Sequence, residues 1–112
     1  MLLCAKHSCH TDLFSGSLKY FGYFNSKLSS LNLTNNTKLE ELHFAGNNVS
    51  TLDVSRNTNL VKLRVFENKL TSLDVSKNNN LQILEVQKNP LTSMYLGDSG
   101  STISTVSVQN IP

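Results

Sequence analysis

The sequence predicts a β-solenoid, a right-handed superhelix of about four coils with short parallel strands and little helix. Two observations predict it. Apolar residues recur at a fixed interval of 21 residues along most of the 112-residue chain. Within each coil their gaps run 3, 2, 5, 3, 2 and 6, which does not match the 3-and-4 spacing of an amphipathic helix. A fixed period of this length is typical of stacked repeats in which each unit contacts only its neighbours.

Eight columns of residues keep this interval in register. They are Leu31, Leu52, Leu73 and Met94; Leu33, Val54, Val75 and Leu96; Leu39, Leu60 and Leu81; Leu42, Leu63 and Leu84; Phe44, Val65 and Val86; Leu28, Val49, Leu70 and Leu91; Asn36, Asn57 and Asn78; and Asn47, Asn68 and Asn89. The series continues weakly at both ends, through Leu18, Phe21 and Tyr23 and, after a one-residue insertion near Ser101, through Ile103, Val106 and Val108. We expect a repeat domain over residues 18–112 and an N-terminal segment over residues 1–17 that is a candidate cap.

Each coil contains the pattern L-x-x-L-x-L twice, for example over residues 39–44 and 49–54. Alternation of apolar and polar residues indicates a β-strand. We therefore expect a first and a second short strand in every coil, stacked about 4.8 Å apart into two narrow parallel sheets around one core. The outward side chains of the two sheets form what we call the first-strand surface and the second-strand surface.

Asparagine follows each strand pattern after two further residues. The six positions are Asn36, Asn47, Asn57, Asn68, Asn78 and Asn89. Where the chain turns out of a sheet, its backbone groups lose their ladder partners, and an asparagine side chain can bond them and tolerate unusual dihedral angles. A buried unpaired backbone group costs about 1–3 kcal/mol. The two asparagine columns therefore predict tight structural corners.

These motifs resemble the leucine-rich repeat, whose signature is L-x-x-L-x-L-x-x-N. The 21-residue form, with Leu52-Asp53-Val54-Ser55-Arg56-Asn57 in one coil, resembles the repeats of bacterial surface proteins of Bacteroidetes and, more loosely, of internalins. The resemblance implies a leucine-rich repeat solenoid. It also implies extracellular or cell-surface adhesion and protein binding, although a fold by itself hosts many functions.

The two surfaces differ in composition. The second-strand positions are small, polar and nearly uniform: Ser29, Ser30, Asn32 and Thr34; Ser50, Thr51, Asp53 and Ser55; Thr71, Ser72, Asp74 and Ser76; and Thr92, Ser93, Tyr95 and Gly97. The first-strand positions vary from coil to coil: Lys19, Tyr20, Gly22 and Phe24; Glu40, Glu41, His43 and Ala45; Val61, Lys62, Arg64 and Phe66; and Gln82, Ile83, Glu85 and Gln87. A scaffold role favours uniform columns, whereas recognition of an irregular partner favours varied ones.

The varied positions predict a non-catalytic module that recognises a protein or a glycan through its first-strand surface, in the manner of an adhesion protein. Aromatic residues and arginine are favoured interface anchors. The candidate binding residues are Tyr20, Phe24, Glu41, His43, Lys62, Arg64, Phe66 and Glu85. The alternatives are freer drift on this surface, and a structural spacer or fragment of a larger surface protein. Ice or crystal binding by the uniform second-strand surface is less favoured, because Asp53, Asp74 and Tyr95 interrupt the flat rows of threonine that it would need.

Other groups of reactive residues favour plainer interpretations. Cys4, His7, Cys9 and His10 span only seven residues, too few to wrap one tetrahedral zinc ion easily. A disulfide between the two cysteines is the next alternative, and free thiols are the favoured one. No nucleophile elbow or nucleotide-binding motif occurs, so we expect no catalysis, no metal and no cofactor.

Asp53 and Asp74 should stack in adjacent coils, where calcium could bridge them, but Asn32 and Tyr95 interrupt the row. Solvated carboxylates bonded to Ser or Asn are favoured. His43 is expected to be an exposed member of a charged row. Three glycosylation sequons, beginning at Asn32, Asn35 and Asn48, are expected by composition alone in such a repeat.

Charge and hydropathy exclude further classes. The net charge is +2 with no basic stripe, which argues against nucleic-acid binding. No apolar run approaches the roughly 20 residues that span a bilayer, and the first residues do not form an export signal. We expect a monomer or part of a longer chain.

Overall fold

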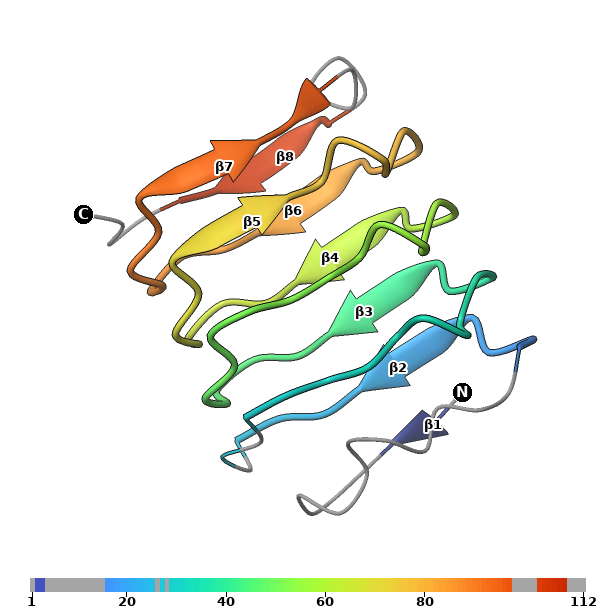
Figure 1. The fold of residues 1–112 in the computed structure, drawn as a ribbon, viewed down its shortest axis with the longest axis horizontal. Helices are drawn as coiled ribbons and strands as arrows, with labels where there is room; N and C mark the ends of the chain where they lie inside the picture. The colour runs from blue at the N-terminus through green and yellow to red at the C-terminus, as the bar shows by residue number, and fades with distance from the viewer. Residues whose placement is uncertain (1, 4–15, 26, 28, 98–102, 109–112) are drawn as a thin grey trace.

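The protein is a flattened β-solenoid in the computed structural model (Figure 1), which describes residues 2–3, 16–25, 27, 29–97 and 103–108. Its eight short strands are β1 (Leu2–Leu3), β2 (Tyr20–Gly22), β3 (Glu41–His43), β4 (Lys62–Arg64), β5 (Ser72–Asp74), β6 (Ile83–Glu85), β7 (Ser93–Tyr95) and β8 (Thr105–Ser107). Every pairing between them is parallel.

The first strands form one sheet in the order β1-β2-β3-β4-β6-β8. Its register aligns residues of successive coils at the predicted interval, so that Leu42 pairs with Leu63 and Leu63 pairs with Leu84. All three side chains are fully buried. The stack predicted from the 21-residue period is confirmed, and so is the solenoid of about four coils.

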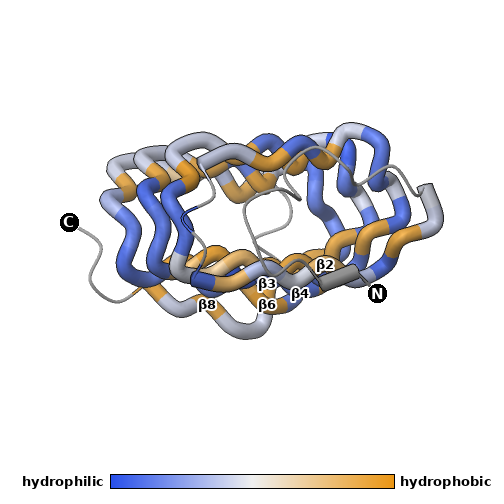
Figure 2. Tube along the Cα trace, turned by 90° about the horizontal axis from the view of Figure 1, so that it is seen from below, coloured by the Kyte–Doolittle hydropathy of each residue, from blue (hydrophilic) through white to orange (hydrophobic). Residues whose placement is uncertain are grey.

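One continuous core lies between the two layers of each coil. Viewed along the solenoid axis, apolar residues line the inside of both layers and hydrophilic residues gather at the corners (Figure 2). Three aromatic rings fill the core of the early coils, Phe21, Tyr23 and Phe44, with centroids 6.0 to 6.4 Å apart. Val65 and Val86 take the corresponding place in later coils.

The second sheet is smaller than the sequence predicts. Among the described residues it contains only β5 and β7, and the corresponding residues 50–54 are not a strand. Leu52 in that segment is only partly buried, whereas Leu73 in β5 is buried.

The first sheet also begins earlier than the repeat pattern. Leu2 and Leu3 pair with Phe21 and Gly22, which places β1 one position before the first regular coil. Thus part of the N-terminal segment 1–17 adds an edge strand to the sheet. The four metal-like residues of that segment, at positions 4, 7, 9 and 10, lie outside the described residues, as does Leu28.

The asparagines that precede the first strands form a ladder of buried amides along one corner. The Nδ2 atom of Asn57 donates to the carbonyls of Leu33, at 3.1 Å, and Asn36, at 2.9 Å. Asn78 repeats this pattern one coil later, toward Val54 and Asn57, at 3.0 and 2.8 Å. Each amide therefore ties its own corner to the corner of the preceding coil.

The asparagines at the opposite corner bond the preceding coil from both ends of the amide. The Nδ2 atom of Asn68 donates to the Phe44 carbonyl at 2.6 Å, and its Oδ1 accepts from the Val49 amide at 3.3 Å. Asn89 does the same toward Val65 and Leu70, at 3.0 Å each. All six corner asparagines are buried, so these bonds replace the water that the turning backbone would otherwise need.

The left-handed backbone at this corner falls on the residue just before each asparagine, not on the asparagine itself. Asn25, Gly46, Glu67 and Lys88 have φ between 52° and 70° and recur every 21 residues. Only Gly46 adopts this conformation without steric cost. A Cβ atom there would collide with the Asn25 side chain. At Glu67 and Lys88 the repeat geometry thus imposes the corner shape on residues that do not favour it.

We predict that Leu63→Ala lowers the free energy of unfolding by roughly 2–5 kcal/mol, because the fully buried side chain leaves a cavity between two neighbouring coils. Val106→Ala is the matched control, since Val106 occupies the same column but is 46% exposed. Its loss should be below about 1.5 kcal/mol. Chemical denaturation followed by circular dichroism measures both. Equal losses would contradict the assignment of Leu63 to the centre of the core.

Candidate binding surface

The first-strand surface consists of parallel columns, each contributed by the same position of successive coils. One column runs Tyr20, Glu41, Lys62 and Ile83, and the next runs Gly22, His43, Arg64 and Glu85. Because the pairing is parallel and in register, side chains of one column are direct neighbours. The sheet therefore converts residues 21 apart in sequence into contiguous groups on one surface.

Glu41 is the centre of one such group. Its Oε1 atom lies 3.3 Å from His43 Nε2 and 3.9 Å from Lys62 Nζ. The Tyr20 ring lies against the His43 ring, with a centroid distance of 5.1 Å. Four of the eight candidate residues, drawn from three coils, thus form one connected cluster of an aromatic ring, an imidazole, a carboxylate and an ammonium group.

Arg64 and Glu85 form a second group beside the first. The Arg64 Nε atom lies 3.2 Å from Glu85 Oε2, and both side chains are partly buried. Within the described part of the chain, the other guanidinium nitrogens of Arg64 have no hydrogen-bond partner. The ion pair fixes the orientation of the side chain while leaving donors for a ligand, which is the arrangement in which arginine recognises carboxylates or stacks on rings.

Phe24 and Phe66 lie in one further column, where the chain leaves the first sheet. Phe24 is exposed, Phe66 is half-buried, and Ala45 lies between them in the column. Gly22 and Ala45 occupy outward positions of the repeat, but both are buried. A residue with little or no side chain does not reach past its larger neighbours.

His43 is also less exposed than the sequence indicates. Its side chain is 14% exposed, because Tyr20 and Glu41 cover it from neighbouring positions. The charged row that we expected around it exists. The expectation of an exposed histidine is wrong, since the alternation of a strand gives the direction of a side chain but not what its neighbours cover.

On the second-strand surface the two aspartates bond within their own coil. Asp53 Oδ1 accepts hydrogen bonds from the Ser55 hydroxyl and, at 2.9 Å, from the Ser55 amide, and Asp74 makes the same two bonds with Ser76. These bonds, the hydroxyl bond first, lower the pKa of both carboxyls below the ordinary value of 3.8. The prediction of solvated carboxylates bonded to serine is confirmed.

Tyr95 departs from the polar character of this surface. It belongs to the second-strand surface, in the column of Asp74, and at 62% exposure it is the most exposed of the large apolar side chains described. The aromatic side chains on the first-strand surface are Tyr20 and Phe66, both half-buried, and the exposed Phe24.

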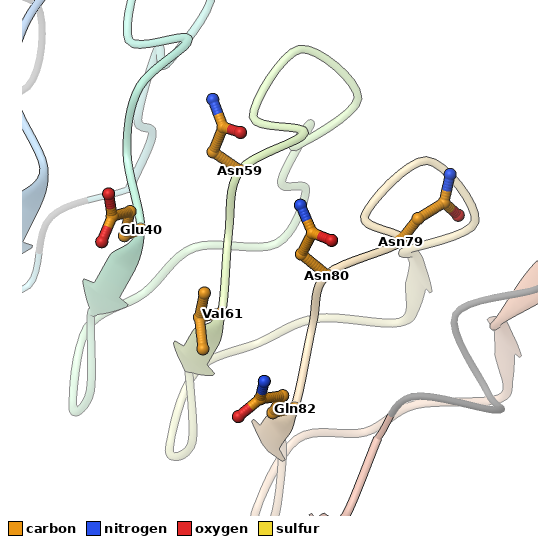
Figure 3. Close-up of a pocket in the computed structure, with 6 residues that line it drawn as sticks. All are labelled: Glu40, Asn59, Val61, Asn79, Asn80 and Gln82. Atoms are coloured by element: carbon orange, nitrogen blue, oxygen red, sulfur yellow. The ribbon is translucent and has the colours of Figure 1, made fainter.

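A hollow of about 380 Å³ lies at the corner beside the first sheet, and sequence reasoning missed it as a site (Figure 3). Three coils line it, through Glu40, Asn59, Val61, Asn79, Asn80 and Gln82. One feature of the sequence could have indicated it. The two residues between the corner asparagine and the next leucine change from Thr37-Lys38 to Asn79-Asn80 along the chain.

Other chemistry finds little support in the part of the chain that is described. No group of three or more His, Cys, Asp or Glu side chains there could hold a metal ion. The described residues also include no helix with the length and apolar content of a membrane span. His43 contacts Glu41 and Tyr20, and neither is an activated nucleophile.

Comparisons with known proteins support the fold. A scan against family models and a search of curated proteins found no match. Among solved structures, the chain is similar to the functional domain of InlJ from Listeria monocytogenes, described as including a cysteine ladder, with a TM-score of 0.71 and 22% identity over 83% of this chain. The match spans 25% of the length of that chain. The fold is therefore that of an internalin-like leucine-rich repeat solenoid.

The InlJ domain is described as including a cysteine ladder, which this chain does not share in its repeats. The two cysteines of this chain, Cys4 and Cys9, precede the repeats, so no repeat column here contains cysteine. Its corners are held instead by the asparagine ladders.

We predict that acid destabilises the fold partly through Asp53 and Asp74. A carboxyl whose pKa is lowered by folding stabilises the protein above its ordinary pKa, and this contribution is lost as the pH falls from about 3.8 through the lowered pKa of the folded state. Melting temperatures measured from pH 6 to pH 2 should therefore fall less steeply in the Asp53→Asn, Asp74→Asn double variant than in the wild type. Parallel pH profiles for the two proteins would refute this role.

Proposed function

We propose that this chain is a non-catalytic recognition module that binds a protein partner through its first-strand surface. The observation that carries the proposal is the connected set of unlike side chains on one continuous sheet, made by Tyr20, Glu41, His43 and Lys62 and by the neighbouring Arg64–Glu85 pair. Such a surface combines aromatic area with charges of both signs, as interface hot spots do.

Pre-organisation supports the proposal. Each charged side chain in the set is held by a partner in its own or an adjacent coil, so less side-chain entropy is lost on binding. Arg64 keeps unpaired donors, and Phe66 and Phe24 supply apolar area at the border of the charged groups. The second-strand surface offers fewer such groups, because Asp53 and Asp74 are already bonded to serines.

The similar domain of InlJ is described as a functional domain. By analogy with that protein, we propose that this chain presents its surface to partners outside the cell, as an adhesion or attachment module, either by itself or within a longer chain. The analogy is one of fold, and the partner is defined here only by its chemistry. It should carry acidic groups that meet Lys62 and Arg64 and an apolar patch that meets Phe66.

The test compares variants of the two surfaces in affinity capture from host-cell and bacterial extracts, with bound proteins identified by mass spectrometry. Arg64→Ala and Phe66→Ala remove an arginine and an aromatic anchor and should each weaken a captured partner by about 1 kcal/mol or more. Asp53→Ala and Ser72→Ala are the controls on the second-strand surface and should leave its affinity unchanged. Thermal melting confirms the folding of all four variants.

A specific partner is one that the wild type and both controls retain and that Arg64→Ala and Phe66→Ala lose. If the control variants lose the partner while Arg64→Ala and Phe66→Ala keep it, the second-strand surface is the binding surface. If no protein shows either pattern, the chain is a spacer rather than a recognition module.

A further inference from the structure

The hollow at the corner beside the first sheet has a composition of its own. Of its six lining residues, four carry a primary amide, one is a carboxylate and one is apolar: Asn59, Asn79, Asn80 and Gln82, then Glu40, then Val61. Figure 3 shows these side chains arrayed over three neighbouring segments of the solenoid. Its volume of about 380 Å³ falls within the range of small-ligand sites.

The amides in the hollow differ in their availability. Asn59 is committed to the fold, because its Nδ2 donates to the Thr37 carbonyl at 2.9 Å. The side chains of Asn79, Asn80 and Gln82 make no hydrogen bond within the described residues, and all three are exposed. Together they present three carbonyl acceptors and three NH₂ donor groups at one place. This contrasts with the corner asparagines, whose NH₂ groups are bonded within the core.

We propose that this hollow binds a neutral saccharide unit. Each hydroxyl of a sugar both donates and accepts, and the coplanar C=O and N–H of one primary amide can bond two neighbouring hydroxyls at once. The Glu40 carboxylate adds an acceptor for a hydroxyl. Val61 supplies an apolar contact for the C–H groups of the ring.

Two other ligand classes fit less well. An anionic ligand would meet the Glu40 carboxylate, and none of the six lining residues is cationic. The neighbouring cation, Lys19, is already paired with Glu40, with its Nζ 3.9 Å from Glu40 Oε2. An extended peptide repeats its backbone pattern every two residues, about 6.6–6.8 Å, whereas equivalent side chains of successive coils are about 4.8 Å apart. The spacing of equivalent amides, such as those of Asn59 and Asn80, therefore does not match the spacing of the backbone groups of a peptide.

The saccharide site does not depend on the proposed protein-binding role. Arg64 and Phe66 lie farther along the strand, toward the opposite corner, and neither lines the hollow. Variants of these two residues should therefore leave saccharide binding unchanged, so failure of either proposal can be recognised separately.

The experiment is a titration of the ¹⁵N-labelled protein, followed by NMR on the side-chain NH₂ signals of asparagine and glutamine. The probes are galactose, mannose, glucose, N-acetylglucosamine, glucuronate and an end-capped tri-alanine peptide. We expect at least one neutral sugar to shift the signals of Asn79, Asn80 and Gln82 saturably, with an affinity in the millimolar range. Glucuronate should bind more weakly than glucose, because it differs by one negative charge.

Two variants and a matched control locate the site. Asn80→Ala should weaken the neutral sugar about fivefold or more, since the loss of a hydrogen bond typically has this effect. Glu40→Gln should reduce the discrimination against glucuronate. Asn48→Ala changes an exposed asparagine at the opposite corner and should leave both affinities unchanged.

The proposal is overturned if none of the neutral sugars shifts these amide signals. It is also overturned if the peptide binds there more tightly than every sugar, or if Asn80→Ala and Asn48→Ala weaken the sugar equally.

Discussion

The buried asparagine amides are the interaction on which the rest of the structure depends. The chain winds through about four coils, and each coil has two tight corners. At each corner some backbone groups have no partner in a strand. Asn57 and Asn78 bond them along one corner, and Asn68 and Asn89 along the other, each reaching into the preceding coil. In a low-dielectric core such bonds are strong when made and costly when missing. They therefore fix the register between coils as well as their shape.

Register is what turns the repeat into a surface. Once corners stack on corners, Leu42, Leu63 and Leu84 must stack inside, and the residues between them must align outside. Glu41 meets Lys62 and Arg64 meets Glu85 for that reason alone. Because the inner columns and corners carry the stability, the outer columns can differ from coil to coil. A leucine-rich solenoid thus separates the residues that hold the fold from those available for recognition.

The 21-residue period of the sequence predicted the features that depend on the direction of side chains. It missed features that depend on the size of side chains and the space between them. Spacing alone correctly placed Leu63 in the core, the first sheet in register and the serine partners of Asp53. It did not predict that residues 50–54 would lie outside the second sheet, or that Tyr20 would cover His43. The cover over His43 depends on the size of an adjacent side chain. The hollow around Asn80 was also missed, since it depends on space between coils.

The free energy of unfolding of Asn68→Ala, compared with that of Asn59→Ala, tests the role of the buried amides most directly. Asn68→Ala leaves the buried Phe44 carbonyl and Val49 amide without the partner that bridges two coils. It should cost at least about 2 kcal/mol. Asn59 makes one exposed bond between coils, and its loss should cost less than about 1 kcal/mol. If both variants lose the same small amount in denaturant titrations, the amide ladders do not hold the coils together.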